Sequence, residues 1–102
     1  MRVISSGRVK DFAKQYPSAE PALLSFLKVA QKGQWRNITE LRKTYPSADA
    51  VTVGSGKTVT VINIRRNEFR LVVAVHYNHG KLFILRFMPH AEYTRGAWKR
   101  TL

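Results

Sequence analysis

Three apolar runs between residues 57 and 93 constrain the fold more than any other feature of the chain. The runs read TVTVINI, FRLVVAVHY and KLFILRFM, and only short polar segments separate them. Runs of this length with alternating apolar residues predict strands, and short polar breaks between strands predict hairpins. We therefore expect a three-stranded antiparallel sheet, with a helix beginning after Pro89.

The alternation within each run predicts which side chains share a face of the sheet. In the middle run the apolar face holds Phe69, Leu71, Val73, Val75 and Tyr77, and the other face holds Arg70, Val72, Ala74 and His76. In the last run we expect the apolar face to hold Phe83, Leu85 and Phe87. For the apolar faces of these two runs to lie on the same side of the sheet, the loop between the runs must contain an odd number of residues. A three-residue loop from Asn78 to Gly80 meets the requirement, because Gly80 can adopt a positive φ.

The first hairpin follows the same logic. A two-residue turn at Arg65-Arg66 or at Arg66-Asn67 places Ile62 and Ile64 on the apolar face. Five polar side chains then converge on the opposite face: Lys57, Asn63, Arg70, Arg86 and His90. Such a face is suited to a polyanion, although the pattern is equally compatible with a solvated face that carries scattered charges.

Two amphipathic segments precede the sheet. The first has its cap at Ser5 or Ser6 and ends at Pro17, and its apolar stripe consists of Val9, Phe12, Ala13 and Tyr16. The second has its cap at Ser18 and ends near Gly33, and its stripe consists of Leu23, Leu24, Phe26, Leu27 and Ala30. We expect these two helices to pack as a hairpin on the apolar face of the sheet.

The segment that joins the second helix to the sheet is expected to be mostly irregular. A short helix is predicted around Ile38, Leu41 and Tyr45, and residues 51–56 are expected to form a flexible approach to the first long strand. Together these elements predict an α+β fold: two N-terminal helices packed on a twisted antiparallel sheet of three or more strands, and a short C-terminal helix.

The composition limits the kinds of partner. The 102 residues include 18 Lys and Arg against 6 Asp and Glu, which gives a net charge of +12. A single domain over residues 1–102 with this charge favours a nucleic acid, or an acidic protein that masks the basic face. The chain has no cysteine, and no apolar run is long enough to span a membrane, so we expect a cytoplasmic protein without a membrane partner.

Few residues are available for catalysis that depends on metals or on paired carboxylates. The three histidines lack the close spacing and acidic neighbours of a metal motif, and only two carboxylates follow Asp49, so we expect no metal and no cofactor. RNA cleavage without a metal needs only cations that stabilise the phosphorane and groups that move two protons. Arg, Lys, His and Tyr can supply these functions.

Three elements of the sequence match a known family: Asn63, Asn67, Phe69, Arg70 and Leu71, the strand that ends near Arg86, and HAEY at residues 90–93. With them, nearly the whole chain resembles the HigB-type toxins of the RelE-like superfamily of mRNA interferases. The sequence departs from the family pattern at three places. Arg65-Arg66 replaces a common glycine pair, Pro89 precedes the histidine, and Thr94 replaces an aspartate.

The resemblance implies a toxin that cleaves translated mRNA on the ribosome. Carried over by position, it implies Arg70 and Arg86 as phosphate clamps, His90 and Tyr93 for proton transfer or substrate orientation, and Asn67 for positioning. Lys57 is added by the strand parity as a base or phosphate ligand. Further RNA contacts are expected from Asn63, Arg65, Arg66 and Lys99.

The implied partners are a cognate helix-turn-helix antitoxin, the ribosome with its mRNA, and operator DNA bound through the antitoxin complex. Two other functions stay open at this point. One is a nonenzymatic basic RNA-binding protein, and the other is a toxin of the same superfamily that poisons a topoisomerase by protein contact.

Overall fold

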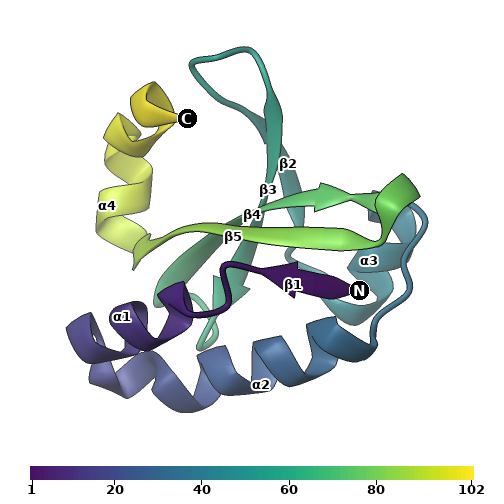
Figure 1. Ribbon diagram of the computed structural model, residues 1–102. Helices are drawn as coiled ribbons and strands as arrows, with labels where there is room; N and C mark the ends of the chain where they lie inside the picture. Colours follow the sequence, from purple (N-terminus) through teal and green to yellow (C-terminus); the bar gives the residue numbers. More distant parts are fainter.

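The computed structural model describes residues 1–102, and its centre is one five-stranded sheet (Figure 1). The strand order is β1-β5-β4-β3-β2, and β1 runs parallel to β5 while the other neighbours are antiparallel. The strands are β1 (Arg2–Ile4), β2 (Asp49–Thr52), β3 (Thr58–Ile64), β4 (Phe69–His76) and β5 (Lys81–Pro89). The three predicted strands are confirmed and the fold is α+β. The sheet is mixed rather than purely antiparallel, because the edge strand β1 runs parallel to β5. The other edge strand, β2, is antiparallel to β3 and includes the start of the segment predicted to be flexible.

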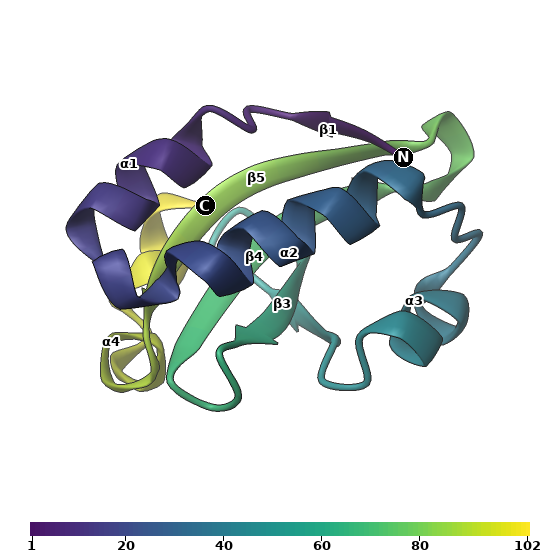
Figure 2. The same cartoon turned by 90° about the horizontal axis from the view of Figure 1, so that it is seen from below.

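The helices lie mainly on one side of the sheet. They are α1 (Arg8–Gln15), α2 (Glu20–Lys32), α3 (Ile38–Thr44) and α4 (His90–Arg95), with 3-10 turns at Pro17–Ala19, Tyr77–His79 and Ala97–Thr101. Figures 1 and 2 show α1 and α2 crossing beneath the sheet, while α4 follows the end of β5 at the left of Figure 1, above α1. We call the face that contacts α1 and α2 the inner face, and the opposite one the outer face.

The C-terminal ends of α1 and α2 agree with the sequence prediction, but their N-terminal caps do not. The first helix ends before Pro17 and the second before Gly33, as predicted. The predicted serine caps are wrong. Gly7 and Ala19 occupy the N-cap positions, and neither helix has a side-chain cap. At α1 the backbone supplies the acceptors instead, because the carbonyl of Ser5 accepts the Arg8 N–H at 3.0 Å.

The core lies between α1, α2 and the inner face. Its largest fully buried side chains include Leu23 from α2, Leu41 from α3 and Leu71 from β4. Leu24, which the sequence grouped with the buried stripe, is 54% exposed and points away from the sheet side. The inner face is therefore fully used by packing, which leaves the outer face as the side of the sheet that can hold a site.

The phase of β5 differs from the prediction in its first half. His76 pairs with Lys81, so the loop holds four residues, and the inner face receives Leu82 and Ile84 in place of Phe83 and Leu85. A bulge between Val72 and Val73 of β4 then leaves Leu85 as the extra residue of β5. The bulge reverses the phase, so the second half of the strand has the predicted arrangement. Phe87 lies on the inner face, and Arg86 lies on the outer face opposite Val72.

The β3–β4 hairpin has a longer loop than predicted but the same parity. Ile64 pairs with Phe69, so four residues, 65–68, form the loop. Arg65 and Arg66 both have positive φ, 52° and 60°. A residue with a Cβ in this region costs about 1–2 kcal/mol. Glycine adopts a positive φ without this cost, so a turn with arginine at both positions is strained.

Candidate nucleic-acid site on the outer face

A second, smaller apolar cluster divides the outer face into two ends. It joins β3, β4 and β5 to the C-terminal segment through Val53, Val59, Val61, Val72, Met88 and Trp98. Trp98 Nε1 donates to the Tyr93 carbonyl at 3.1 Å, and the Gly54 N–H donates to the Lys99 carbonyl at 2.8 Å. A Cβ on Gly54 would lie 2.9 Å from that carbonyl oxygen, so the close contact requires glycine. The C-terminal segment thus covers the middle of the outer face.

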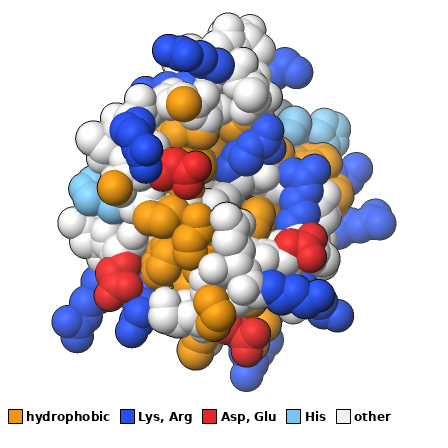
Figure 3. All heavy atoms as spheres, turned by 90° about the vertical axis from the view of Figure 1, so that its left-hand side faces the viewer, with side chains coloured by type: hydrophobic (Ala, Val, Ile, Leu, Met, Phe, Trp, Pro, Cys, Tyr) orange, Lys and Arg blue, Asp and Glu red, His pale blue; other side chains and the backbone are white.

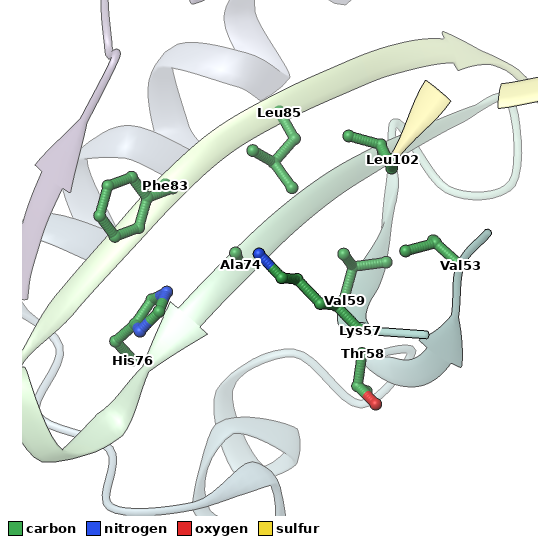
Figure 4. Close-up of a pocket in the computed structure, with 9 residues that line it drawn as sticks. All are labelled: Val53, Lys57, Thr58, Val59, Ala74, His76, Phe83, Leu85 and Leu102. Carbon is green, nitrogen blue, oxygen red and sulfur yellow. The ribbon is translucent and has the colours of Figure 1, made fainter. Parts of the chain in front are cut away.

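One end of the outer face is an open hollow of about 560 Å³. Its apolar lining consists of Val53, Val59, Ala74, Phe83, Leu85 and Leu102. Its polar lining consists of Lys57, Thr58 and His76. Figure 4 shows the Lys57 side chain reaching over the sheet toward Ala74, with the His76 ring at the far side of the same space. We call this space the hollow.

The polar groups of the hollow are available to a ligand. Lys57 and His76 are both exposed, and neither side chain makes a hydrogen bond or an ion pair. The His76 ring packs edge to face on Phe83, with 5.0 Å between ring centroids, which holds the imidazole at the wall. An ammonium and an imidazole therefore share a solvent-accessible space with an apolar floor.

Arg86 lies beside the hollow because of the β5 bulge. Leu85 lines the hollow, and both Leu85 and Arg86 are on the outer face. Arg86 is half-buried, and its guanidinium donates to the Leu85 carbonyl at 3.1 Å and to Thr101 Oγ1 at 3.4 Å. These two bonds orient a cation that retains further N–H donors for an anion.

The other end of the outer face holds a more tightly bonded group, which we call the corner: Asn63, Asn67, Arg70 and Tyr93. Arg70 is only 8% exposed, and it donates to Asn67 Oδ1 at 2.7 Å and to the carbonyls of Asn67 and Phe69. Its Cζ lies 5.6 Å from the centre of the Tyr93 ring, which stacks on Trp98. Asn63 pairs with Arg70 across the sheet. Arg70 thus has no carboxylate partner, and several of its donors are already used.

Of the remaining predicted residues, three lie around the corner, whereas Lys99 belongs to the C-terminal segment that covers the middle of the outer face. His90 is exposed at the first position of α4, and its backbone N–H donates to the Glu68 carbonyl at 2.9 Å. Arg65 and Arg66 are exposed at the hairpin tip. Lys99 is exposed, with its Nζ 5.8 Å from the centre of the Trp98 ring.

The predicted convergence of five polar side chains is therefore only partly correct. All share the outer side of the sheet or its end, but Lys57 lies six residues along the chain from Asn63, the partner of Arg70. Six residues of extended strand span about 20 Å. Lys57 belongs to the hollow with His76, whereas Asn63 and Arg70 belong to the corner.

His76 is the candidate that the sequence analysis did not select. Its signal was present, because the alternation placed His76 on the same face as Arg70, and Lys57 on that face of the neighbouring strand. The β3–β4 register brings the start of β3 beside the end of β4, and only this pairing shows that His76 lies near Lys57.

Charge alone does not locate the site. Figure 3, which views the molecule from the side of α1 and α4, shows hydrophobic side chains in the middle and Lys and Arg around them. No group of three or more His, Cys, Asp or Glu residues could hold a metal ion, and no helix is long and apolar enough to cross a membrane. What the hollow adds is that two unbonded polar groups, Lys57 and His76, share one open space with an apolar lining.

An α+β domain with a strong excess of cations and an open hollow on the free face of its sheet is typical of proteins that bind a polyanion. The comparisons specify the class further. Residues 11–96 match the family model of HigB toxins, described as the RelE-like toxic component of a toxin-antitoxin system, and the chain belongs to this family. A toxin of such a system has an antitoxin as its partner.

Curated relatives cover most of the chain. The mRNA interferase toxin HigB of Escherichia coli strain K12 is 29% identical over 93 residues, which are 91% of this chain and 88% of the relative. The mRNA interferase HigB of Shigella flexneri gives the same identity and coverage. The family resemblance inferred from the sequence is thereby confirmed.

Proposed function

We propose that this protein is an mRNA interferase, a ribosome-dependent endoribonuclease that cleaves translated mRNA in the hollow. The observation that carries the proposal is the pairing of Lys57 and His76 in one open space, in a chain whose relatives are named mRNA interferases. These are two groups that can exchange protons, and both are free of other partners.

The chemistry requires two proton transfers and one site of charge stabilisation. The ribose 2′-oxygen forms a bond to phosphorus while the bond from phosphorus to the 5′-oxygen breaks. The products are a 2′,3′-cyclic phosphate and a 5′-hydroxyl. One member of the Lys57–His76 pair takes the proton of the 2′-hydroxyl, and the other gives a proton to the departing oxygen. Arg86 stabilises the charge that develops on the phosphoryl oxygens, and no step needs a metal.

The apolar floor of the hollow supports this assignment. Phe83, Leu85 and Leu102 reduce the water around the polar groups once RNA fills the space. Electrostatic stabilisation is stronger in such a site than in open water. Phe83 also offers an aromatic surface on which an unpaired base can stack, as is common in the recognition of single-stranded RNA.

We assign the corner to positioning rather than to proton transfer. Arg70 is buried under Tyr93, and its guanidinium donates hydrogen bonds to Asn67, so it fixes the end of the β3–β4 hairpin. His90 and Asn63 lie near this end, and Lys99 lies on the C-terminal segment. All three can contact the RNA strand outside the hollow. Tyr93 orients the C-terminal segment through its stack with Trp98.

The partners follow from the same function. We propose a helix-turn-helix antitoxin that covers the hollow with acidic residues, and an autoregulatory complex in which the antitoxin holds operator DNA. The excess of cations is expected to favour an acidic partner surface and fast association. A cytoplasmic location follows from access to the ribosome.

The experiment compares wild type with the double variant Lys57→Met, His76→Asn, each expressed from a tightly repressed promoter. Primer extension then maps the 5′ ends of cellular messages after induction. We expect growth arrest with new cuts in translated messages for wild type, and neither effect for the double variant. The matched control is Lys43→Met, His79→Asn, which makes the same replacements at exposed positions outside the hollow and should behave as wild type.

Other outcomes would reject the proposal. Growth arrest without cuts would favour a binding protein or a topoisomerase poison. Cuts that persist in the hollow variant would place the cleavage elsewhere. Cuts in untranslated RNA would contradict the dependence on the ribosome.

A further inference from the structure

The tip of the β3–β4 hairpin has a property that neither the hollow nor the core explains. Arg65 and Arg66 adopt positive φ at consecutive positions, and both side chains are exposed. Arg66 makes no hydrogen bond or ion pair. Arg65 makes one exposed pair with Glu68 at 3.1 Å, and such pairs contribute little to stability. The arginines therefore add strain to the fold without stabilising it through contacts.

The tip is nevertheless held firmly from within. Arg70, which is buried, donates to both the side chain and the carbonyl of Asn67. The backbone N–H of His90 donates to the carbonyl of Glu68. Two neighbouring elements thus fix the backbone of the loop that presents the arginines, so this backbone loses less conformational entropy when the tip binds a ligand.

We propose that the tip, Arg65–Glu68, is a second nucleic-acid contact, which binds the phosphate backbone of double-stranded RNA apart from the hollow. Guanidinium groups match phosphate oxygens with paired N–H donors. The strain persists because glycine, which would relieve it, has no charge. A residue in a strained conformation that the surrounding structure enforces is a reason to look for a function at that position.

The residues of the tip favour a duplex over other polyanions. All four are exposed and polar, and none is aromatic. Recognition of single-stranded RNA relies on bases stacked on aromatic side chains, whereas duplex RNA is bound through its phosphates and 2′-hydroxyls. Protein interfaces have an apolar centre, which these four residues lack. A projecting loop with two guanidinium groups fits a duplex backbone best.

The test measures binding and stability together on the variant Arg65→Gly, Arg66→Gly. The probes are a fluorescent RNA duplex of about 16 base pairs and a single strand of the same length. For the duplex we expect about tenfold weaker binding near 100 mM salt, and a log–log salt slope that falls by about 1 to 2. The single strand should lose much less. The melting temperature should rise by about 2–5 °C, because glycine relieves the strain.

Two control variants separate charge from backbone. Arg65→Lys, Arg66→Lys keeps both charges and the strain, so we expect most of the salt slope to remain and no rise in melting temperature. Lys10→Ala, Lys14→Ala removes the same charge from the exposed side of α1 and should change duplex binding by less than about threefold.

The outcomes are distinct from those of the proposed nuclease, because binding is measured without cleavage. Equal losses for the tip and α1 variants would show an effect of net charge only and overturn the proposal. Unchanged duplex binding combined with weaker binding of a purified acidic antitoxin would assign the tip to a protein partner, and would also overturn it.

Discussion

The two ends of the outer face carry similar residues in opposite states. In the hollow, Lys57 and His76 are exposed and have no partners, whereas in the corner Arg70 is buried and bonded to Asn67 and to the Phe69 carbonyl. A cation whose N–H donors are free can bind a substrate. A cation whose N–H donors are bonded within the protein instead holds its neighbours in place. We therefore base the proposed catalytic and positioning roles on whether a cation already has hydrogen-bond partners, and not only on the face of the sheet that it occupies.

The largest effect is expected from removing the ammonium group of the hollow. Lys57→Met should lower the single-turnover rate of mRNA cleavage by about 10²–10⁴, because one proton-transfer group is lost. The melting temperature should stay close to that of wild type, since the side chain is exposed and makes no hydrogen bond. Rapid-quench assays with ribosome-bound message measure the rate. A loss below about tenfold would mean that Lys57 does not take part in proton transfer.

A smaller effect is expected at the edge of the hollow. Arg86→Met should slow cleavage by about 10²-fold, because the variant cannot stabilise the developing charge. Arg86→Lys should recover part of this loss, since a charge remains but the planar donor pair of the guanidinium is lost. If Lys and Met have the same rate, Arg86 acts through packing and not through charge.

The corner is expected to affect stability more than chemistry. Arg70→Met leaves the Asn67 and Phe69 acceptors without their donor, and the free energy of unfolding should fall by about 1–3 kcal/mol. Urea denaturation measures this change. Cleavage below the unfolding range should stay within about tenfold of wild type. A rate loss as large as that of Lys57→Met at unchanged stability would instead make Arg70 a catalytic residue.

Local sequence signals predicted most of the fold, and long-range pairing determined the rest. The alternation in the strands and the stops at Pro17 and Gly33 are local, and the structure confirms both. The β5 bulge is not visible in the alternation, because an extra residue at Leu85 and a fourth loop residue at Tyr77 cancel over the length of the strand. Arg86 was therefore placed on the correct face although the first half of β5 was not.

The site was harder to predict than the fold for a similar reason. Parity assigns a side chain to a face but says nothing of position along the strand or of what covers the sheet. The C-terminal cover through Trp98 and the bonding of Arg70 depend on tertiary contacts between distant segments. His76 was overlooked because its neighbour Lys57 is far from it in the sequence.

The most direct test places the two ends of the outer face side by side. The single-turnover rate of cleavage of ribosome-bound mRNA would be measured for two double variants, Lys57→Met, His76→Asn in the hollow and His90→Ala, Tyr93→Phe at the corner. We predict a loss of at least about 10³ for the hollow variant and less than about tenfold for the corner variant. The reverse order, with cleavage lost at the corner and kept in the hollow variant, would contradict the account.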